Sequence, residues 1–459
     1  MSEDATLDDF VDAENTEETE TAIESDEDTG THPRFGSLPS DWNIKEVAEI
    51  ADVIGGSTPS TDNDDYWDGE IWWATPTDIT GLSGNTIEET ADTLTKEGLE
   101  SASTHLLPPR SVLMTSRATI GACAVNTVEM ATNQGFKSLV PKDGIETWYL
   151  HYRLLETAAF LESLGSGSTF DEVSKTVVET VDIPVPPVSE QRKIATVLHT
   201  VDQAIQKTEE IIEQVERLKK GVGQDLIHTG IEYPQTKSAW MGEIPSHWDV
   251  REFSELVDLS QNGIYKENDD YDGPYPIIKM GDIFGGVTLD TPIAERVHLE
   301  DDEVEKYATE EGDLVFARHA QAGWGAGDCT YVPDLDEPAV VESNMVHVRL
   351  TNDVDPLFYA QYFNHEIGVK SIKRITTTGN IKSISQGDLM SLKVPVPPKE
   401  EQEEISNMLS VFDKQTENSK SEVERLRRLK QALMQDLLSG TVQTTDTNIE
   451  VPDEIAQHG

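Results

Sequence analysis

The sequence predicts a mixed α/β (α+β) protein with two similar domains in pseudo-twofold duplication, separated by two long helices that form an antiparallel coiled coil. Three observations predict this arrangement. The stretch 181–227 returns as 392–438, so that Pro184 matches Pro395 at an offset of 211 residues. Each copy consists of a short apolar run, a pair of adjacent prolines (called the proline clamp below) and a long helical pattern. Strand-like runs with long loops precede each copy, and a period of this length indicates a duplicated unit.

Each half also begins with a similar block. Residues 37–56 read SLPSDWNIKEVAEIADVIGG, and residues 243–263 read EIPSHWDVREFSELVDLSQNG. Both contain Pro-Ser-x-Trp, followed by apolar positions that alternate with charged ones. We interpret Trp42 and Trp248 as core anchors at the start of each domain. The repeat therefore frames both ends of each half.

Short strands are predicted next. Ile71, Trp73 and Thr75 alternate with other residues after a run of turn formers, which favours a strand that leads into a turn at Thr77-Asp78. The second half has a thinner match, with residues 275–279 as the strand and 281–283 as the turn.

The rest of each half predicts more strands, a helix and a small polar loop. The paired segments are 106–125 with 310–332 (strand, turn, strand), 130–141 with 341–350 (extension of the sheet), 146–165 with 355–374 (helix), and 165–175 with 376–386 (loop). Each half is therefore predicted as a mixed α/β domain of about 150 residues.

After each proline clamp, apolar residues recur at alternating spacings of four and three, which is typical of a coiled coil. The predicted seam of the first helix is Ile194, Leu198, Val201, Ile205, Thr208, Ile212, Val215, Lys219, Val222 and Leu226. That of the second helix is Ile405, Leu409, Phe412, Thr416, Ser419, Val423, Leu426, Lys430, Leu433 and Leu437. Lys219 and Lys430 match, and polar seam residues fix register and partner at some cost in stability.

A helix of about 39 residues rises roughly 58 Å. Two such helices in one chain most simply pair with one another, and antiparallel pairing places one domain at each end. Two alternatives stay open, in which each helix docks on its own domain or dimerises with another chain. The predicted limits are 1–32 (acidic disordered tail), 33–187 (first domain), 188–230 (first helix), 238–398 (second domain), 399–440 (second helix) and 441–459 (C-terminal tail).

The charge of the chain is unusual. Asp and Glu number 87 against 35 Lys and Arg, for a net charge of −52, and residues 1–31 carry 13 of the acids and no Lys or Arg. The remainder still carries −39, so the acid is spread over the whole chain. We interpret it as a halophilic surface, because at molar salt the Debye length is roughly 3 Å and self-repulsion is screened. An acidic protein that mimics DNA is the alternative.

Membrane and secreted classes are disfavoured. The sequence has no run of 18 or more apolar residues, and its acidic N-terminus lacks the basic and apolar regions of a secretory signal. Cys123 and Cys329 lie in different halves, which favours a reducing cytoplasm over a disulfide scaffold.

No catalytic or metal site is predicted. The sequence lacks a G-x-x-x-x-G-K-[ST] phosphate loop, the Asn/Asp-Pro-Pro-aromatic motif of amino-methyltransferases, H-E-x-x-H, and a Cys/His cluster at metal-ligand spacing. The glycine-rich stretch 323–327 lacks the context of a nucleotide site and predicts a turn. Two divergent domains on a rigid spacer instead indicate bipartite binding, in which the spacing in the protein sets the spacing in the target.

Over residues 35–440 the sequence resembles the specificity (S) subunit of type I restriction–modification systems. The motifs are GGSTPS with YWDGEIWWATPTDI, SRATIG, ATNQGFKSL, GSTFDEVSK, and the twice-used IPVPP or VPVPP followed by EQ. The resemblance implies two target-recognition domains that each read one half of a bipartite sequence in double-stranded DNA. It implies that the helices set the gap between the half-sites and dock two modification (methyltransferase) subunits. The second half lacks the GGTP-like turn and SRATIG, which weakens the carry-over there.

The resemblance also implies a non-catalytic chain without a cofactor of its own. Methylation with S-adenosylmethionine belongs to the modification subunits. ATP- and Mg-dependent translocation and cleavage belong to restriction subunits.

Base edges are read by polar side chains on exposed loops. The candidates in the first half are Ser57, Thr58, Thr75, Thr77, Arg117, Thr119, Asn133, Gln134, Ser168 and Thr169. Those in the second half are Lys279, Arg318, His319, Gln321, Asn344, Asn380 and Lys382. A turn or capping role is the alternative for each. Arg117 and Arg318 are the strongest candidates, because both follow a predicted strand at a comparable place.

Two other functions stay open. An acidic DNA mimic would bind another enzyme and ignore duplex DNA, and a coiled-coil adaptor would have no role with nucleic acid. Because phosphate contacts weaken as salt rises, we also expect binding at molar salt to depend on base readout, shape fit and burial.

Overall fold

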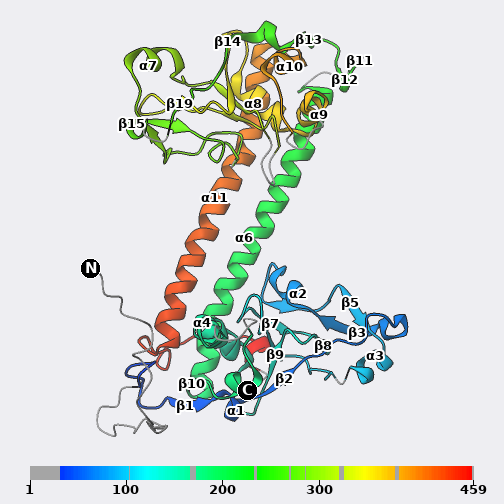
Figure 1. Cartoon of the computed structure of the whole chain (residues 1–459), viewed down its shortest axis with the longest axis vertical. Coiled ribbons are helices and arrows are strands. Elements are labelled where there is room, and N and C mark those ends of the chain that lie inside the picture. The colour runs from blue at the N-terminus through cyan, green and yellow to red at the C-terminus, as the bar shows by residue number, and fades with distance from the viewer. Residues whose placement is uncertain are drawn as a thin grey trace, which may run out of the picture. The chain divides into compact units, whose positions relative to one another are not determined.

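The computed structural model describes residues 32–456 except 103, 166–171, 232–234, 268–269, 285, 320–324 and 378–381. The chain divides into two units, Met1–Thr200 with Lys430–Gly459, and Val201–Leu429. Each unit contains one α/β domain, part of one long helix and part of the other (Figure 1). No helix within the described ranges has the length and apolar character needed to span a membrane.

The first unit is built from two sheets and a strand pair. Its elements are β1 (Asn43–Glu46), α1 (Val47–Ile50), β2 (Ala51–Gly55), the 3₁₀ turn η1 (Asp64–Tyr66), β3 (Trp67–Ala74), α2 (Pro76–Thr80), β4 (Thr86–Ile87), β5 (Asp92–Leu94), α3 (Lys96–Ser101), β6 (Val112–Met114), β7 (Cys123–Asn126), β8 (Met130–Thr132), β9 (Lys137–Pro141), α4 (Thr147–Gly165), α5 (Lys175–Glu179), β10 (Asp182–Val185) and the first part of α6 (Val188–Thr229). The strand orders are β2-β9-β6-β7-β4, β5-β3-β8 and β1-β10.

The five-stranded sheet of the first unit is buried on both faces. Val112 and Met114 of β6 pack in one core with Trp42 and α4, whereas Leu113 between them packs in a second core with Phe136. Successive side chains of a strand point to opposite faces, so both sides of β6 carry apolar residues. This explains the unbroken apolar run in the sequence of β6.

The second unit repeats this plan. Its elements are β11 (Thr236–Ala239), β12 (Gly242–Pro245), β13 (Asp249–Glu252), the 3₁₀ turn η2 (Phe253–Leu256), β14 (Val257–Asn262), β15 (Tyr271–Ile278), β16 (Arg296–Val297), α7 (Asp301–Tyr307), β17 (Leu314–Ala317), β18 (Cys329–Tyr331), β19 (Val340–Val341), β20 (Met345–Leu350), α8 (Pro356–Asn364), α9 (Glu366–Ile375), α10 (Gln386–Met390), β21 (Lys393–Val396) and most of α11 (Lys399–Leu438). The strand orders are β14-β20-β17-β18, β16-β15-β19, β13-β21 and β11-β12.

The prediction of a single helix over 355–374 is wrong, because two helices, α8 and α9, occupy this segment. His365 between α8 and α9 has extended backbone (φ −81°, ψ 155°) and caps α9. A Cβ on Gly368 would collide with the carbonyl of Tyr362, so glycine allows α9 to begin tightly against the end of α8. The predicted helix 146–165 corresponds to the single helix α4.

The two long helices pair side by side in the second unit (Figure 1). Glu209 lies 2.8 Å from Arg427, and Glu216 lies 3.9 Å from Lys420. As the residue number rises along α6, the residue number of the ion-pair partner on α11 falls. The antiparallel coiled coil within one chain is therefore confirmed.

The heptad seam is also confirmed. All twenty predicted seam residues are buried or half-buried, whereas the other residues of α6 from 206 to 221 are exposed apart from Glu209. The matched polar residue Lys219 forms an ion pair with Asp413 of α11. The helix bounds lie within two residues of the predicted limits, and the other domain limits stay predictions.

The segment after α11 packs against the first unit. Ile455, in α12 (Asp453–Ala456), is fully buried in the same core as Trp42. Nζ of Lys193 on α6 donates hydrogen bonds to the carbonyls of Thr444 at 3.1 Å and Thr447 at 2.9 Å. Residues 1–31, predicted as a disordered tail, lie outside the described residues.

Candidate nucleic-acid interface

Four loops of the first unit meet along one edge of its sheets. β3 and β8 are parallel, with Ala74 opposite Thr132, so the residues after both strands emerge together. The end of β2 pairs with the start of β9, and Thr115 after β6 bridges Phe136 at the same place. We call this edge the first rim, and it consists of residues 56–58, 75–77, 116–119 and 133–135.

Gly56 joins two of these loops. It packs so closely on the backbone carbonyls of Thr132 and Asn133 that a Cβ at this position would collide with both. The N–H of Ser57 then donates to the carbonyl of Thr132 at 3.0 Å. Only glycine permits this approach, so Gly56 has a packing role.

Thr58, Gln134 and Thr77 are accessible on the first rim. The hydroxyl of Thr58 is hydrogen-bonded to Oε1 of Gln134. Gln134 and Thr77 are exposed, and Thr58 is half-buried. Two predicted candidates from distant parts of the sequence are thus brought into direct contact.

Thr75 and Asn133 shape the rim through local turns. Thr75 follows β3 instead of lying in it, and its N–H and hydroxyl both donate to Asp78, at 2.7 and 2.6 Å. Oδ1 of the buried Asn133 accepts from the N–H of Gly135 at 2.8 Å. Thr75 therefore makes the capping contact, and Asn133 the turn contact, that were the alternatives to base reading.

Arg117 projects between the other loops of the rim. A Cβ on Gly135 would lie 3.2 Å from Nε of Arg117 and 2.9 Å from both Asn133 Oδ1 and Pro76 Cγ. The missing side chain at Gly135 makes room for the half-buried guanidinium. Thr119, two residues later, is exposed.

Lys137 is a supporting residue that the sequence did not single out. Its side chain is 11% exposed, and Nζ lies 3.1 Å from Glu172 and donates to Ser116 at 3.2 Å. It ties β9 to the loop that carries Arg117. The available signal was a lysine inside an apolar strand run, because a buried cation requires partners.

The second unit contains a matching edge, the second rim, made of residues 263–265, 279–282, 318–319 and 342–344. Gly263 packs on the carbonyls of Val341 and Glu342 in the way that Gly56 packs on its own loop. The N–H of Ile264 donates to the carbonyl of Val341 at 2.7 Å. These contacts show that the backbone of the rim is duplicated.

Lys279 takes the place of Thr75. Its N–H donates to Asp282 at 2.7 Å, and its Nζ lies 3.3 Å from Glu295 and 4.2 Å from the ring centre of Tyr271. Burial lowers the pKa of Lys279, but the hydrogen bond with Glu295 and the neighbouring Tyr271 outweigh it and raise the pKa above its ordinary value. Lys279 is therefore a firmly charged group on this rim.

Arg318 and Arg117 are not structural counterparts. The N–H of Arg318 donates to the carbonyl of Asn344 at 3.1 Å. In the same way, the N–H of Ser116 on the first rim donates to the carbonyl of Gly135 at 2.8 Å. His319 is thus the counterpart of Arg117. Successive residues of extended backbone point to opposite sides, so the one-residue shift separates the two arginines.

The remaining candidates divide into two groups. Asn344 and Lys382 are exposed. Four candidates lie outside the described residues, namely Ser168, Thr169, Gln321 and Asn380.

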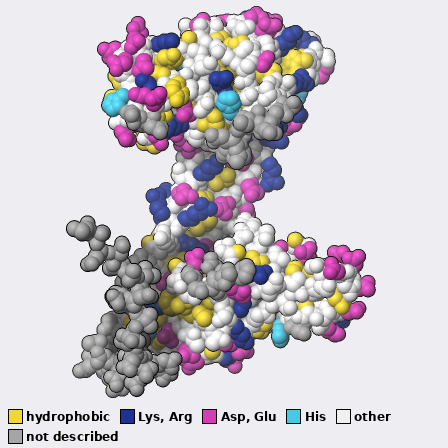
Figure 2. Space-filling model, viewed as in Figure 1, with side chains coloured by type: hydrophobic (Ala, Val, Ile, Leu, Met, Phe, Trp, Pro, Cys, Tyr) yellow, Lys and Arg dark blue, Asp and Glu magenta, His cyan; other side chains and the backbone are white. Residues whose placement is uncertain are grey.

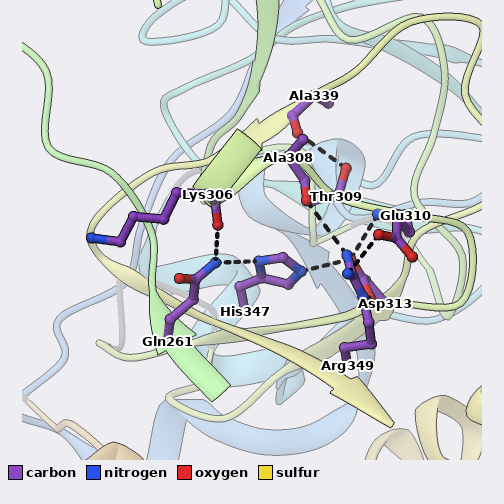
Figure 3. A network of polar contacts seen from close by, with 9 residues as sticks. All are labelled: Gln261, Lys306, Ala308, Thr309, Glu310, Asp313, Ala339, His347 and Arg349. Carbon is purple, nitrogen blue, oxygen red and sulfur yellow. Dashed lines mark hydrogen bonds and ion pairs between the residues drawn. The ribbon is translucent and has the colours of Figure 1, made fainter. Parts of the chain in front are cut away.

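A buried polar network supports the second rim (Figure 3). Nε2 of Gln261, at the end of β14, donates to the carbonyl of Lys306 at 3.0 Å and to Nδ1 of His347 at 3.3 Å. Nε2 of His347 donates to Asp313 at 2.6 Å, and Arg349 makes two bonds of 2.8 Å to the same carboxylate. Burial acts to raise the pKa of Asp313, but these hydrogen bonds outweigh it and hold the pKa below its ordinary value.

In the part of the chain that the structure describes, no group of three or more His, Cys, Asp or Glu residues could hold a metal ion.

Comparison with known families gives a match on both halves. Residues 39–217 and 245–428 each match the type I restriction modification DNA specificity domain. The chain belongs to this family. Its two copies of the specificity domain coincide with the duplication in the sequence and with the two rims.

Several specificity subunits are similar to this chain. The MjaIX specificity subunit of Methanocaldococcus jannaschii is 27% identical over 432 residues, which cover 90% of this chain and 96% of that protein. The EcoKI specificity subunit of Escherichia coli K12 is 23% identical over 307 residues, covering 64% and 65%.

Two solved structures share the fold of this specificity-family chain. The S subunit from M. genitalium has a TM-score of 0.56 at 14% identity, covering 87% of this chain and 96% of that one. A chain from a structural study of assembly and conformational transition in the type I R-M system has a TM-score of 0.52 at 17% identity, covering 88% and 100%.

Proposed function

We propose that this chain is the DNA sequence-recognition (specificity) subunit of a type I restriction–modification complex. It reads a bipartite target in double-stranded DNA, with one domain for each half-site. The main observation in support is that both rims have the same backbone contacts but different side chains. Base edges are read by side chains, so two such rims suit two different half-sites.

The differences between the rims concern the residues that reach outward. Lys279 replaces Thr75, and His319 replaces Arg117. The residues that hold the backbone are kept, as in the glycine contacts and in the aspartate that caps the turn after β3 or β15. This separation favours a common scaffold with independently chosen specificity.

The chain itself is proposed to be non-catalytic and to bind no cofactor. Two modification subunits would supply S-adenosylmethionine-dependent methylation of DNA. Restriction subunits would supply the ATP- and Mg-dependent translocation and cleavage.

The surface of the paired helices supports docking of these partners. α6 and α11 carry 13 of the 35 Lys and Arg but only 16 of the 87 Asp and Glu. Figure 2 shows Lys, Arg, Asp, Glu and hydrophobic side chains mixed along the helices, and a gathering of Asp and Glu over α7. A surface on which acidic and basic residues nearly balance, in a chain that is otherwise strongly acidic, suits a protein interface.

One flank of the coiled coil is also apolar. Glu209 and its ion-pair partner Arg427 mark the charged flank. The opposite flank carries Ile211 and Leu218, seven residues apart, and Leu429 of α11, which are 44%, 60% and 47% exposed. Exposed apolar residues that cluster in this way are typical of interaction surfaces.

We propose a cytoplasmic protein from a salt-rich environment, as the spread acidity indicates. Counterion release lowers log affinity by about 0.9 per phosphate contact for each log unit of salt. At molar salt, base readout and shape fit would supply most of the affinity. A salt titration of the assembled complex on its cognate site tests this, and a steep slope of about −10 contradicts it.

Methylome sequencing with and without the gene tests the main proposal. We expect one bipartite methylated motif that disappears with the gene. Exchange of residues 33–187 for the corresponding domain of a relative should change one half of the motif only. An acidic DNA mimic or a coiled-coil adaptor would leave every motif unchanged.

A further inference from the structure

Tyr265 is the most exposed of the large hydrophobic side chains among the described residues, at 74%. It lies in the loop after β14, on the second rim. The sequence did not single it out as a candidate. When a partner covers such an exposed aromatic ring, the burial of its apolar surface favours binding.

The residues on both sides of Tyr265 are firmly anchored. Ile264 is 5% exposed, and its N–H is bonded to the carbonyl of Val341. Nζ of Lys266 lies 2.6 Å from Glu303 of α7, and the lysine side chain is only 10% exposed. The backbone at Tyr265 is therefore held from both directions while its ring projects outward.

The polar network in Figure 3 fixes the strand that leads into this loop. Gln261 lies four residues before Tyr265 and is bonded to Lys306 of α7 and to His347 of β20. α7 thus holds the chain before and after the tyrosine, through Gln261 and Lys266. A side chain presented by a rigid segment costs less entropy to order on binding.

The place of Tyr265 in the duplicated rim points to its role. The glycine contacts align Gly263 with Gly56, so Tyr265 takes the place of Thr58. Thr58 and its partner Gln134 offer hydrogen-bonding groups to the first half-site. The corresponding position of the second rim offers an aromatic ring instead.

We propose that Tyr265 is a specificity-determining residue that reads the second half-site through apolar contact of its ring with a thymine methyl group. In the major groove, thymine is marked by its C5 methyl, which apolar side chains contact. The proposal rests on the function proposed above and adds the chemical class of the contact. The two half-sites are then read by different chemistry at equivalent positions.

The test uses the full chain assembled with its modification subunits and duplexes that carry the methylated motif. Each thymine of the motif is replaced in turn by uracil, which removes only the methyl group. We expect one replacement in the second half-site to weaken binding about fourfold, as for one buried methyl group. Tyr265→Ala should weaken binding to the thymine duplex by at least as much and should abolish the difference between thymine and uracil. Tyr265→Phe should behave as the wild type.

Thr58→Ala is the matched control, because it truncates the equivalent position of the first rim. It should affect the first half-site and leave the uracil effect in the second half-site unchanged.

The inference is overturned if Tyr265→Ala keeps the wild-type affinity and uracil sensitivity, or if no uracil replacement in the second half-site matters. A second half-site without an A·T pair also overturns it. Loss of assembly with the modification subunits in the absence of DNA would instead make Tyr265 a protein contact. If the wild-type complex selects no bipartite sequence at all, the proposed function itself fails.

Discussion

Nε1 of Trp42 donates a buried hydrogen bond of 3.0 Å to Oε2 of Glu190. The other oxygen of Glu190 accepts the backbone N–H of Thr444, in the segment after α11, at 3.2 Å. One carboxylate therefore ties the start of the domain, the start of α6 and the chain after α11 together. The second unit has the same bond of 3.0 Å between Trp248 and Glu401.

Replacement of this carboxylate should destabilise the first unit. In Glu190→Gln, an amide N–H₂ group must face one of the two donors, so a buried donor is left unsatisfied at a cost of about 1–3 kcal/mol. Denaturant unfolding of the full chain, followed by tryptophan fluorescence, measures the effect. Glu401→Gln should act in the same way on the second unit. Glu210→Gln, at an exposed position of α6, is the control, and an equal effect of Glu190→Gln and Glu210→Gln would refute the role.

The ion pair between Lys219 and Asp413 should help to set the register of the coiled coil. Lys219→Asp places two acids together and should lower the stability of the paired helices. The double variant Lys219→Asp with Asp413→Lys should restore it. Because both side chains are partly exposed, we expect a coupling of roughly 1 kcal/mol in a double-mutant cycle. Additive effects of the two single changes would argue against the pair.

The length of the paired helices should set the gap in the target. Insertion of one heptad into each helix, after residues 213 and 424, keeps the seam and adds roughly 10 Å of rise, or about three base pairs. Methylome sequencing should then report both half-sites unchanged and a longer gap. A four-residue insertion, which breaks the heptad pattern, is the control for loss of pairing. An unchanged gap after the heptad insertion would count against this role of the helices.

Glu146 should make the stability of the first unit depend on pH. Burial raises the pKa of this carboxyl from 4.5 to about 7, although the N–H of Tyr149 and the charge of Arg110 act to lower it. The folded state binds a proton more tightly than the unfolded state, so stability falls as pH rises from about 4.5 through about 7. We expect Glu146→Gln to remove this loss, so that wild type and variant diverge between pH 5 and 8 in thermal unfolding. Parallel curves would rule out the assignment.

The one-residue shift between the rims predicts which second-half residue matches Arg117. Arg117→Ala should relax one position of the first half-site and cost about 1–3 kcal/mol in specific binding, which is the contribution of an arginine contact with a base edge. His319→Ala should relax the second half-site, because His319 occupies the equivalent place. Arg318→Ala should leave the methylated motif unchanged. The motifs of the three variants, read by methylome sequencing, decide this, and a change with Arg318→Ala in place of His319→Ala would reverse the assignment.

Sequence and tertiary structure contributed different parts of this picture. The duplication follows from the repeat at an offset of 211 residues. The α/β class and every seam position of the coiled coil follow from local periodicity, since a helix or strand imposes a fixed spacing on its buried residues. The break at His365 did not follow, because no Pro or Gly stands there and only the contact between Gly368 and Tyr362 reveals it.

The rims show the same division. The sequence alone determined which loops carry polar side chains and that two such sets exist. Only the tertiary structure decided that Gly56 joins two loops, that His319 aligns with Arg117, and that Tyr265 stands in the place of Thr58. The physical reason is that these matches depend on hydrogen bonds between strands distant in sequence. Their offsets differ from loop to loop, so no single period in the sequence records them.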